Sequence, residues 1–333
     1  MKSKFDFNDI LIQPATTSKI SSRSEVNPYV NGYLPLITAP MDTVVDTNNI
    51  DLYSSLKINV CLPRGEYYVD NNVFISYSLD DFIFLYEEKL LNNSGSYLID
   101  IANGHMEKLL THVRLCKEKY PNIRLMVGNV ANPETYVELS NAGADLVRCG
   151  IGNGNACSTT LQTGVGYPMA SLIQECYDAS CLLDNPAKIV ADGGMKSYSD
   201  VIKALALGAD YVMVGSIFNK AIESCGDNYL FGKIKVSQEF AELAYRYKLP
   251  VYKKFRGMST KEVQKKWGKV KLTTSEGVIR YRKVEYPLKK WVNNFEDYLR
   301  SAMSYTDSKT LNEFIGNVSI IKITNNAFNR FNK

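Results

Sequence analysis

The sequence contains two histidines and no segment that could cross a membrane. No apolar run reaches the roughly 18 residues that a transmembrane helix needs, and residues 1–6 lack the apolar core of a secretory signal. His105 and His112 lack zinc-ligand spacing relative to Cys176 and Cys181, which themselves do not form a CxxC pair. We therefore expect a protein without a membrane anchor, a secretory leader or a zinc site.

Disulfide-framework spacing is also missing. The cysteines number seven, an odd count, and they are scattered along the chain. Such a pattern is typical of free thiols in a reducing compartment, so we expect a cytoplasmic protein. The positions are Cys61, Cys116, Cys149, Cys157, Cys176, Cys181 and Cys225.

A strong charge of either sign is lacking as well. Lys and Arg total 39 against 35 for Asp and Glu, giving a net charge of +4, and the basic residues are spread out. We therefore expect no nucleic-acid partner. The one dense basic stretch, residues 261–271, is interpreted as a solvated helix or loop face, with a site for a phosphate-bearing small ligand as the alternative.

What the chain does contain is a repeated alternation of strand-like and helix-like segments. With 45% hydrophobic residues it can bury a large core. Eight short apolar runs, most of them continuous, indicate strands buried on both faces, and segments such as 106–119, 133–142 and 198–207 have helical periodicity. This predicts an α/β fold, a single-domain (β/α)₈ TIM barrel over residues 1–333, with a doubly wound open sheet as the alternative. The runs are residues 34–38, 58–62, 73–77, 97–101, 123–127, 145–149, 188–191 and 211–214.

Unusual residues follow the carboxyl ends of the predicted strands. In a barrel, active sites are assembled at that edge, although any one glycine pair would also suit a plain strand-to-helix turn. The residues concerned are Pro40 to Asp42, Asp100, Gly128 and Asn129, the loop around Cys157, Asp192 to Gly194, and Gly215 with Ser216.

The loop around Cys157 is the most informative of these. Gly150, Gly152 and Gly154 allow a tight backbone that can turn its amides and carbonyls toward a ligand. A cysteine in such a polar loop is accessible as a thiolate nucleophile, and a purely structural cysteine would not need this setting. An ordinary surface turn is the alternative interpretation of the glycine-rich loop taken by itself.

These segments together resemble the IMP dehydrogenase and GMP reductase family over nearly the whole chain. That family consists of (β/α)₈ barrel enzymes. The residues that carry the resemblance are 7–11, 22–26, 41–44, the glycine loop through Cys157, 192–194, 208–216, 256–259 and 299–305.

The resemblance implies three catalytic residues. Cys157 would attack C2 of the purine and form a covalent adduct, which requires the thiolate form. Thr159 and Glu276 would form the relay that protonates the departing 2-amino group.

The resemblance also implies the nucleotide site. Asp192 would accept hydrogen bonds from the ribose hydroxyls, a helix N-cap being the alternative role. The 5′-phosphate would lie on backbone amides that follow two adjacent strands. The implied substrate-binding residues are Asn155, Asp192, Gly193, Gly194, Gly215, Ser216, Gly257, Met258, Ser259 and Gly277.

For the redox cofactor, the resemblance implies NADPH, with NADH as the alternative, and a potassium ion. Backbone carbonyls of Gly152, Gly154 and Cys157 would hold the potassium, since hard cations prefer oxygen ligands. Arg64 is the nearest candidate for a basic residue that relatives carry after the second strand. The implied cofactor-binding residues are Ser22, Arg23, Asp100, Ile101, Ala102, Ile151 and Gly152.

The branch of the family follows from a missing pair. Dehydrogenases of the family use an Arg and a Tyr on a flap to activate water, and residues 259–275 contain neither. The chain also lacks the inserted regulatory module of many dehydrogenases. We therefore expect a GMP reductase that converts GMP to IMP and ammonia. The alternatives are an IMP dehydrogenase-like oxidation of IMP and a reductase for a modified or deoxy purine nucleotide.

The remaining expectations concern assembly and other classes of protein. A flap and active-site loop is expected at about 250–285. Relatives form homotetramers, and the amphipathic segment 291–303 would help shape a neighbouring site or pack on its own barrel. A non-catalytic nucleotide-binding barrel and a flavin-dependent barrel oxidoreductase are the alternatives from other classes.

Overall fold

An eight-stranded parallel sheet forms the centre of the molecule. The computed structural model describes residues 3–268 and 274–331, and its strand order is β2-β9-β8-β7-β6-β5-β4-β3. Each strand lies within a few residues of its predicted range. The bounds are β2 (Leu36–Thr38), β3 (Cys61–Leu62), β4 (Phe74–Tyr77), β5 (Ser96–Asp100), β6 (Arg124–Val130), β7 (Leu146–Cys149), β8 (Lys188–Asp192) and β9 (Tyr211–Val214).

The two ends of this sheet meet and close a barrel. Ile37 of β2 forms a parallel bridge with Asn59, just before β3. The Thr38 amide donates to the Asn59 carbonyl at 3.0 Å, and the Asn59 amide donates to the Leu36 carbonyl at 3.0 Å. The predicted (β/α)₈ barrel is thereby confirmed, and the open-sheet alternative is wrong.

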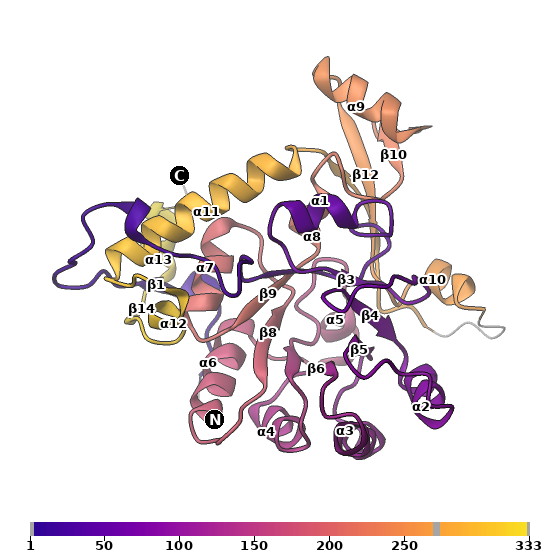
Figure 1. Ribbon diagram of the computed structural model, residues 1–333. Coiled ribbons are helices and arrows are strands. Elements are labelled where there is room, and N and C mark those ends of the chain that lie inside the picture. The colour runs from indigo at the N-terminus through magenta and orange to yellow at the C-terminus, as the bar shows by residue number, and fades with distance from the viewer. Residues whose placement is uncertain (1–2, 269–273, 332–333) are drawn as a thin grey trace.

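Helices surround the barrel and connect its strands (Figure 1). The segments predicted from helical periodicity appear as α3, α4 and α7, with ends that differ by one residue. A capping box at Ser197 and Asp200 fixes the start of α7. The helices up to β9 are α1 (Ile50–Ser55), α2 (Leu79–Glu87), α3 (Glu107–Lys119), α4 (Pro133–Asn141), α5 (Thr159–Thr163), α6 (Met169–Ser180) and α7 (Tyr198–Ala206).

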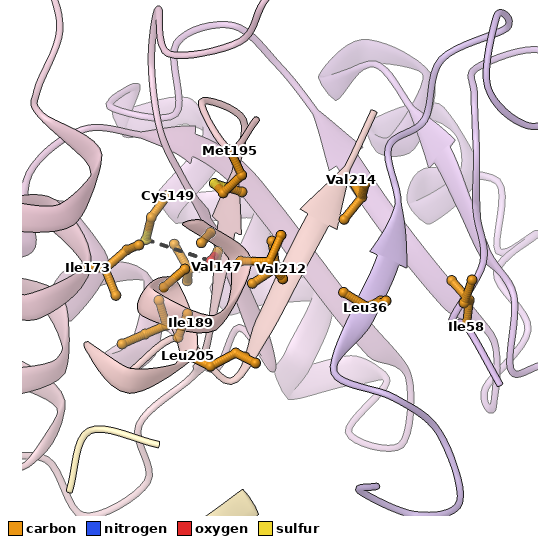
Figure 2. Close-up of a cluster of buried hydrophobic side chains, with 14 of the residues drawn as sticks. Leu36, Ile58, Val147, Cys149, Ile173, Ile189, Met195, Leu205, Val212 and Val214 are labelled. Carbon is orange, nitrogen blue, oxygen red and sulfur yellow. Dashed lines mark hydrogen bonds between the residues drawn. The ribbon is translucent and has the colours of Figure 1, made fainter. Parts of the chain in front are cut away.

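Both faces of the barrel strands are buried, but in two separate clusters. Outward side chains such as Val147, Ile189 and Val212 pack against Ile173 of α6 and Leu205 of α7 (Figure 2). Successive side chains of a strand point to opposite faces. The intervening residues therefore fill the barrel interior. They are Ile37, Ala39, Cys61, Phe74, Leu98, Met126, Leu146, Val190 and Met213.

A second, antiparallel sheet follows β9 and the short helix α8 (Ser216–Asn219). Its strand order is β11-β10-β12-β13, and Figure 1 shows α9 and β10 projecting from the barrel. The flap expected at about 250–285 corresponds to β12, α10 and β13, with residues 269–273 outside the described part. The bounds are β10 (Asn228–Leu230), β11 (Ile234–Val236), α9 (Gln238–Arg246), β12 (Val251–Arg256), α10 (Lys261–Lys266) and β13 (Ile279–Lys283).

The C-terminal segment packs on the barrel and meets the N-terminus. The apolar face of α11 (Leu288–Tyr305) joins the main core, and Trp291 stacks on Tyr198 of α7 with ring centroids 5.0 Å apart. The apolar face of α11 therefore covers the barrel of the same chain. A contribution of α11 to the active site of a neighbouring subunit stays a prediction. The remaining elements are η1 (Phe7–Asp9), β1 (Ile10–Ile12), which pairs with β14, η2 (Arg23–Glu25), α12 (Leu311–Phe314), β14 (Ile320–Lys322) and α13 (Asn325–Phe331).

Two sequence expectations concern what the chain lacks. Within residues 3–268 and 274–331, no helix combines the length and apolarity needed to span a bilayer. Strands β4 and β5 are connected by α2 and short turns. The absence of a regulatory module stays a prediction for the protein as a whole.

Candidate active site

A pocket of about 470 Å³ opens at the carboxyl ends of the barrel strands, where the sequence places its unusual residues. Its wall brings together segments from most of the barrel and from the flap. The predicted site residues in this wall are Asp100, Ile101, Ala102, Ile151, Gly152, Gly154, Asn155, Cys157, Thr159, Asp192, Gly193, Gly194, Gly215, Ser216, Gly257, Met258, Ser259 and Glu276.

Cys157, Thr159 and Glu276 form a continuous line along one side of the pocket. The Sγ of Cys157 lies 3.1 Å from the Thr159 Oγ1, and Thr159 donates a hydrogen bond of 2.6 Å to Oε2 of Glu276. All three side chains are half-buried. A nucleophile is thus connected to a carboxyl group through one hydroxyl, an arrangement that can move a proton between them.

Backbone pairing holds this line in place. Residues 276–278 run beside residues 156–158: the Ser158 amide donates to the Glu276 carbonyl at 2.7 Å, and the Val278 amide donates to the Ala156 carbonyl at 3.0 Å. Gly277, the remaining predicted substrate residue, forms an antiparallel bridge with Cys157 itself. A Cβ at Gly257 would lie 2.5 Å from the Ala156 carbonyl oxygen. Glycine at 257 therefore permits the flap to approach the cysteine loop.

A buried arginine stands at the centre of the barrel mouth. Arg148 donates to Oδ1 of Asp100 at 2.7 Å and to Oδ2 of Asp192 at 2.8 Å. Its side chain is only 7% exposed, so the two carboxylates supply the charge compensation that a buried guanidinium requires. The pKa of Arg148 rises above its usual value because the attraction of Asp192 and Asp100 outweighs the effect of burial.

Strand periodicity explains why these three residues meet. Asp100, Arg148 and Asp192 each follow an inward-facing core residue by two positions, and side chains two apart share a face. Each therefore points into the barrel, one layer nearer the pocket. The core residues below them are Leu98, Leu146 and Val190.

Asn129, near the end of β6, is a second hydrogen-bond donor to Asp192. Its Nδ2 donates to Oδ2 of Asp192 at 2.7 Å and to the Gly150 carbonyl at 2.8 Å. Oδ2 of Asp192 is thus shared by Arg148 and Asn129. Among the described residues no donor reaches Oδ1 of Asp192, so that oxygen can accept a hydrogen bond from a ligand.

The loops after β7 and β8 lie against each other in the pocket wall. Gly193 has φ +85°, and a Cβ there would lie 3.0 Å from both Cα and N of Gly154. Only glycine tolerates this backbone and this approach. Within the described chain the amides of Gly193 and Gly194 donate to no protein acceptor, so they can bind an anion.

The flap closes over the pocket through charged contacts. Arg64 donates from Nε to Oδ2 of Asp100 at 3.2 Å, and its guanidinium lies 4.6 Å from the ring centroid of Trp267. Asp42 forms ion pairs with Arg256 at 2.6 Å and with Lys266 at 3.1 Å. Burial alone would raise the pKa of Asp42, but the hydrogen bonds from Arg256 and Lys266 outweigh it and the pKa is lowered.

The basic stretch 261–271 is thereby partly explained. It begins as helix α10, whose lysines are exposed as expected for a solvated face, and the exposed Lys266 also forms an ion pair with Asp42. Its last residues, 269–271, lie outside the described residues.

Not every predicted residue lies at the pocket. Ser22 and Arg23 begin the short helix η2, which contacts α11 and does not contribute to the pocket wall. Their role in cofactor binding stays a prediction. Of the proposed potassium ligands, the Gly154 carbonyl accepts the Cys157 amide at 2.9 Å. No group of three or more His, Cys, Asp or Glu side chains suited to a metal occurs among the residues described.

Sequence reasoning missed several pocket residues. Arg148 carried a usable signal, because a charged residue inside the otherwise apolar run 145–149 needs a buried partner. Phe255, Gln264 and Trp267 carried none, since they reach the wall only through the folding of the flap.

Comparison with known proteins agrees with this architecture. Residues 89–331 match the family described as IMP dehydrogenase / GMP reductase domain. The chain is 31% identical to a GMP reductase of Buchnera aphidicola, over 98% of this chain and 97% of that protein. It is 30% identical to a GMP reductase of Onchocerca volvulus, over 96% and 91%. An inosine-5′-monophosphate dehydrogenase of Chlorobaculum parvum is 36% identical, over 68% of this chain and 44% of that protein. The chain therefore belongs to the IMP dehydrogenase / GMP reductase family, whose members are oxidoreductases.

Proposed function

We propose that this protein is a GMP reductase that converts GMP to IMP and ammonia with NADPH, through a covalent thioimidate at Cys157. The observation that carries the proposal is the line Cys157–Thr159–Glu276, with 3.1 Å and 2.6 Å between its successive polar atoms. Such a line joins a nucleophile to a proton relay, as deamination at a purine carbon requires.

The nucleotide lies across the pocket in this proposal. The free Oδ1 of Asp192 accepts a ribose hydroxyl, and the amides of Gly193 and Gly194 bind the 5′-phosphate together with those of Gly215 and Ser216. Side chains and amides of the flap segment that includes Gly257, Met258, Ser259 and Gly277 hold the base beside Cys157. Asn155 adds its carboxamide to the phosphate end.

The first half of the reaction removes ammonia. The Cys157 thiol passes its proton through Thr159 to Glu276, and the resulting thiolate attacks C2 of GMP. A C2–S bond forms, and the C2–N bond to the 2-amino group breaks. The leaving group takes a proton through Thr159, whose hydroxyl is replenished from Glu276. The thiol hydrogen is thus accounted for in the ammonia, and the purine remains attached to Cys157 as a thioimidate.

The second half reduces the adduct. Asp100, Ile101, Ala102, Ile151 and Gly152 would hold the nicotinamide of NADPH, which when bound would supply a hydride to C2. The pocket wall places these residues on the same cavity as Cys157, which supports the fit. The C2–S bond then breaks, its electrons return to sulfur, and IMP leaves with hydrogen at C2.

The dehydrogenase alternative needs a base that activates water. The family's Arg–Tyr pair is not found in residues 259–275, and Arg256 is occupied by Asp42 and Glu262 at 2.6 Å each. We therefore rank reduction of GMP above oxidation of IMP.

Further parts of the proposal rest on the family resemblance. They are a preference for NADPH over NADH, a potassium ion on the carbonyls of Gly152, Gly154 and Cys157, a homotetramer, and a cytoplasmic location. All seven cysteines are free, which agrees with a reducing compartment.

The test is a pair of assays on the purified protein. GMP with NADPH is followed by nicotinamide absorbance and by ammonia release, and IMP with NAD is followed by absorbance. Oxidation of NADPH with equimolar ammonia supports the proposal. Reduction of NAD with IMP would replace it by the dehydrogenase, and silence in both assays would favour a different purine or a binding role.

A further inference from the structure

A hydrogen bond joins the flap strand β13 to the loop that carries Cys157. Nη1 of Arg280 donates to Oδ1 of Asn155 at 3.0 Å. The two residues are 125 positions apart. Asn155 lines the pocket, whereas Arg280 is exposed and is not part of the pocket wall.

The chemistry of this bond fixes the orientation of the Asn155 carboxamide. An arginine has only donors, so it must meet the oxygen of the amide. Since Oδ1 is engaged by Arg280, the donor group Nδ2 is left for the pocket. The loop of Asn155 lies against that of Gly193 and Gly194, whose free amides form the anion end of the site.

Arg280 also brings a charge that no acidic group neutralises. Among the described residues no carboxylate lies within 4 Å of Arg280, or of Lys253 and Arg282 on the same face of the hairpin β12–β13. That face is defined by the register, which pairs Lys253 with Arg282 and Phe255 with Arg280. Phe255 belongs to the pocket wall.

Other charges around the pocket are compensated. Arg148 and Arg64 bind Asp100, Arg148 also binds Asp192, and Arg256 binds Asp42. On the side of the hairpin that faces Asn155, by contrast, positive charge remains without such a partner among the described residues. A dianionic group in the pocket would remove this imbalance.

We propose that Arg280 is a positioning residue for the phosphate of the substrate. It holds the Asn155 carboxamide with its donor toward the pocket and places a positive charge behind it, so that the site selects a nucleoside monophosphate over the nucleoside. The inference rests on the proposed function, which puts the 5′-phosphate at this end of the pocket.

The test is binding of GMP and of guanosine, measured by calorimetry without any nicotinamide. Arg280→Gln should weaken GMP binding roughly tenfold, as expected for one hydrogen bond assisted by charge, and leave guanosine binding within about twofold. Arg280→Lys should recover part of the loss. Lys283→Gln is the matched control, because Lys283 is an exposed cation on the opposite face of the same strand, and it should leave both affinities unchanged.

A double-mutant cycle with Asn155→Ala separates positioning from general electrostatics. In the Asn155→Ala background, Arg280→Gln should cost clearly less than in the wild type. Equal losses for GMP and guanosine in Arg280→Gln, or equal losses in Arg280→Gln and Lys283→Gln, would overturn the inference. If Arg280→Gln does not fold, the ratio of GMP affinity to guanosine affinity in Arg280→Lys decides: it must be lower than in the wild type and be lowered less than in Asn155→Ala, and an unchanged ratio in Arg280→Lys would overturn the inference.

The outcome is distinguishable from that of the proposed function. A protein that binds GMP with the expected dependence on Arg280 but never oxidises NADPH keeps the inference and loses the reductase. A protein that turns over GMP, but whose ratio of GMP affinity to guanosine affinity does not depend on Arg280, keeps the reductase and loses the inference. Failure to bind any purine nucleoside monophosphate overturns both.

Discussion

Thr159 donates a hydrogen bond of 2.6 Å to Glu276 although 117 residues separate them along the chain. The bond joins the segment after β7 to the flap, which follows the last barrel strand in the sequence. It exists because residues 276–278 pair with the backbone next to Cys157. The nucleophile loop and the flap therefore form one unit, and the chemistry proposed here depends on that unit.

Breaking this relay should slow deamination without preventing nucleotide binding. Glu276→Gln keeps the shape of the side chain but removes the acid, so ammonia release from GMP should fall by about 10²- to 10⁴-fold. Thr159→Val should have a similar effect, and Thr159→Ser, which keeps the hydroxyl, should retain most of the activity. Ammonia release in single turnovers measures the step. Undiminished release in Glu276→Gln would remove Glu276 from the relay.

The contact of Asp42 with the flap should control how firmly α10 is held. Asp42→Asn removes the charge that binds Arg256 and Lys266, and since the Asp42 side chain is only 9% exposed, we expect a loss of about 1–3 kcal/mol in flap closure. Hydrogen exchange of residues 257–266 at pH 7 should accelerate accordingly.

The matched control for this variant is Asp80→Asn, which breaks an exposed pair with Lys108 at 2.7 Å and should leave α10 unchanged. Equal exchange in Asp42→Asn and wild type would show that other contacts hold the flap. Because the pKa of Asp42 is lowered from 3.8, its contribution should persist above that pH and disappear as the pH falls below it.

Lys253 should make stability rise with pH in the alkaline range. It is fully buried, and burial lowers its pKa from 10.5 to about 8. Between these values the unfolded chain binds the proton and the folded protein does not, so the free energy of unfolding should increase by up to about 1.4 kcal/mol per pH unit.

Urea unfolding at pH 8, 9 and 10 tests this effect. The wild type should gain about 2 kcal/mol relative to Lys253→Met over this range, whereas Lys283→Met, which removes an exposed lysine from the neighbouring strand, should show the wild-type slope. Parallel pH profiles for wild type and Lys253→Met would contradict the assignment.

Trp267 should report ligand binding by its fluorescence. The sequence has two tryptophans; Trp267 lines the pocket beneath Arg64, and Trp291 is buried between Tyr198 and Phe295. In Trp291→Phe, which leaves Trp267 as the only tryptophan, saturating GMP should change the tryptophan emission. The same addition to Trp267→Phe should leave the emission of Trp291 constant. An unresponsive Trp267 would mean that the flap does not cover the bound nucleotide.

The barrel could be predicted from the sequence because its strands are buried on both faces and read as continuous apolar runs. The runs ending at Cys149 and Val214, for example, end at the same residues in β7 and β9. The projecting strands β10 and β11 escaped prediction for the opposite reason. They are three residues long, and β11 is largely exposed, so local pattern does not reveal their pairing.

The loops of the candidate site could be predicted from the sequence, but the hydrogen bonds and ion pairs between its side chains could not. Strand ends gave Asp100 and Asp192, and period-two alternation explains their meeting, yet the guanidinium of Arg148 between them was hidden in an apolar run. The contact of Glu276 with Thr159 depends on how the flap folds back, which spacing in the sequence does not encode. The family resemblance supplied that pairing.

The most direct test of the central claim is intact-protein mass spectrometry after acid quench of a mixture with GMP. The wild-type protein should give a species that is heavier by the mass of GMP less ammonia, with the added mass on the peptide that contains Cys157. This species should be missing in Cys157→Ala. Turnover of GMP by Cys157→Ala at the wild-type rate, or an adduct on any other residue, would contradict it.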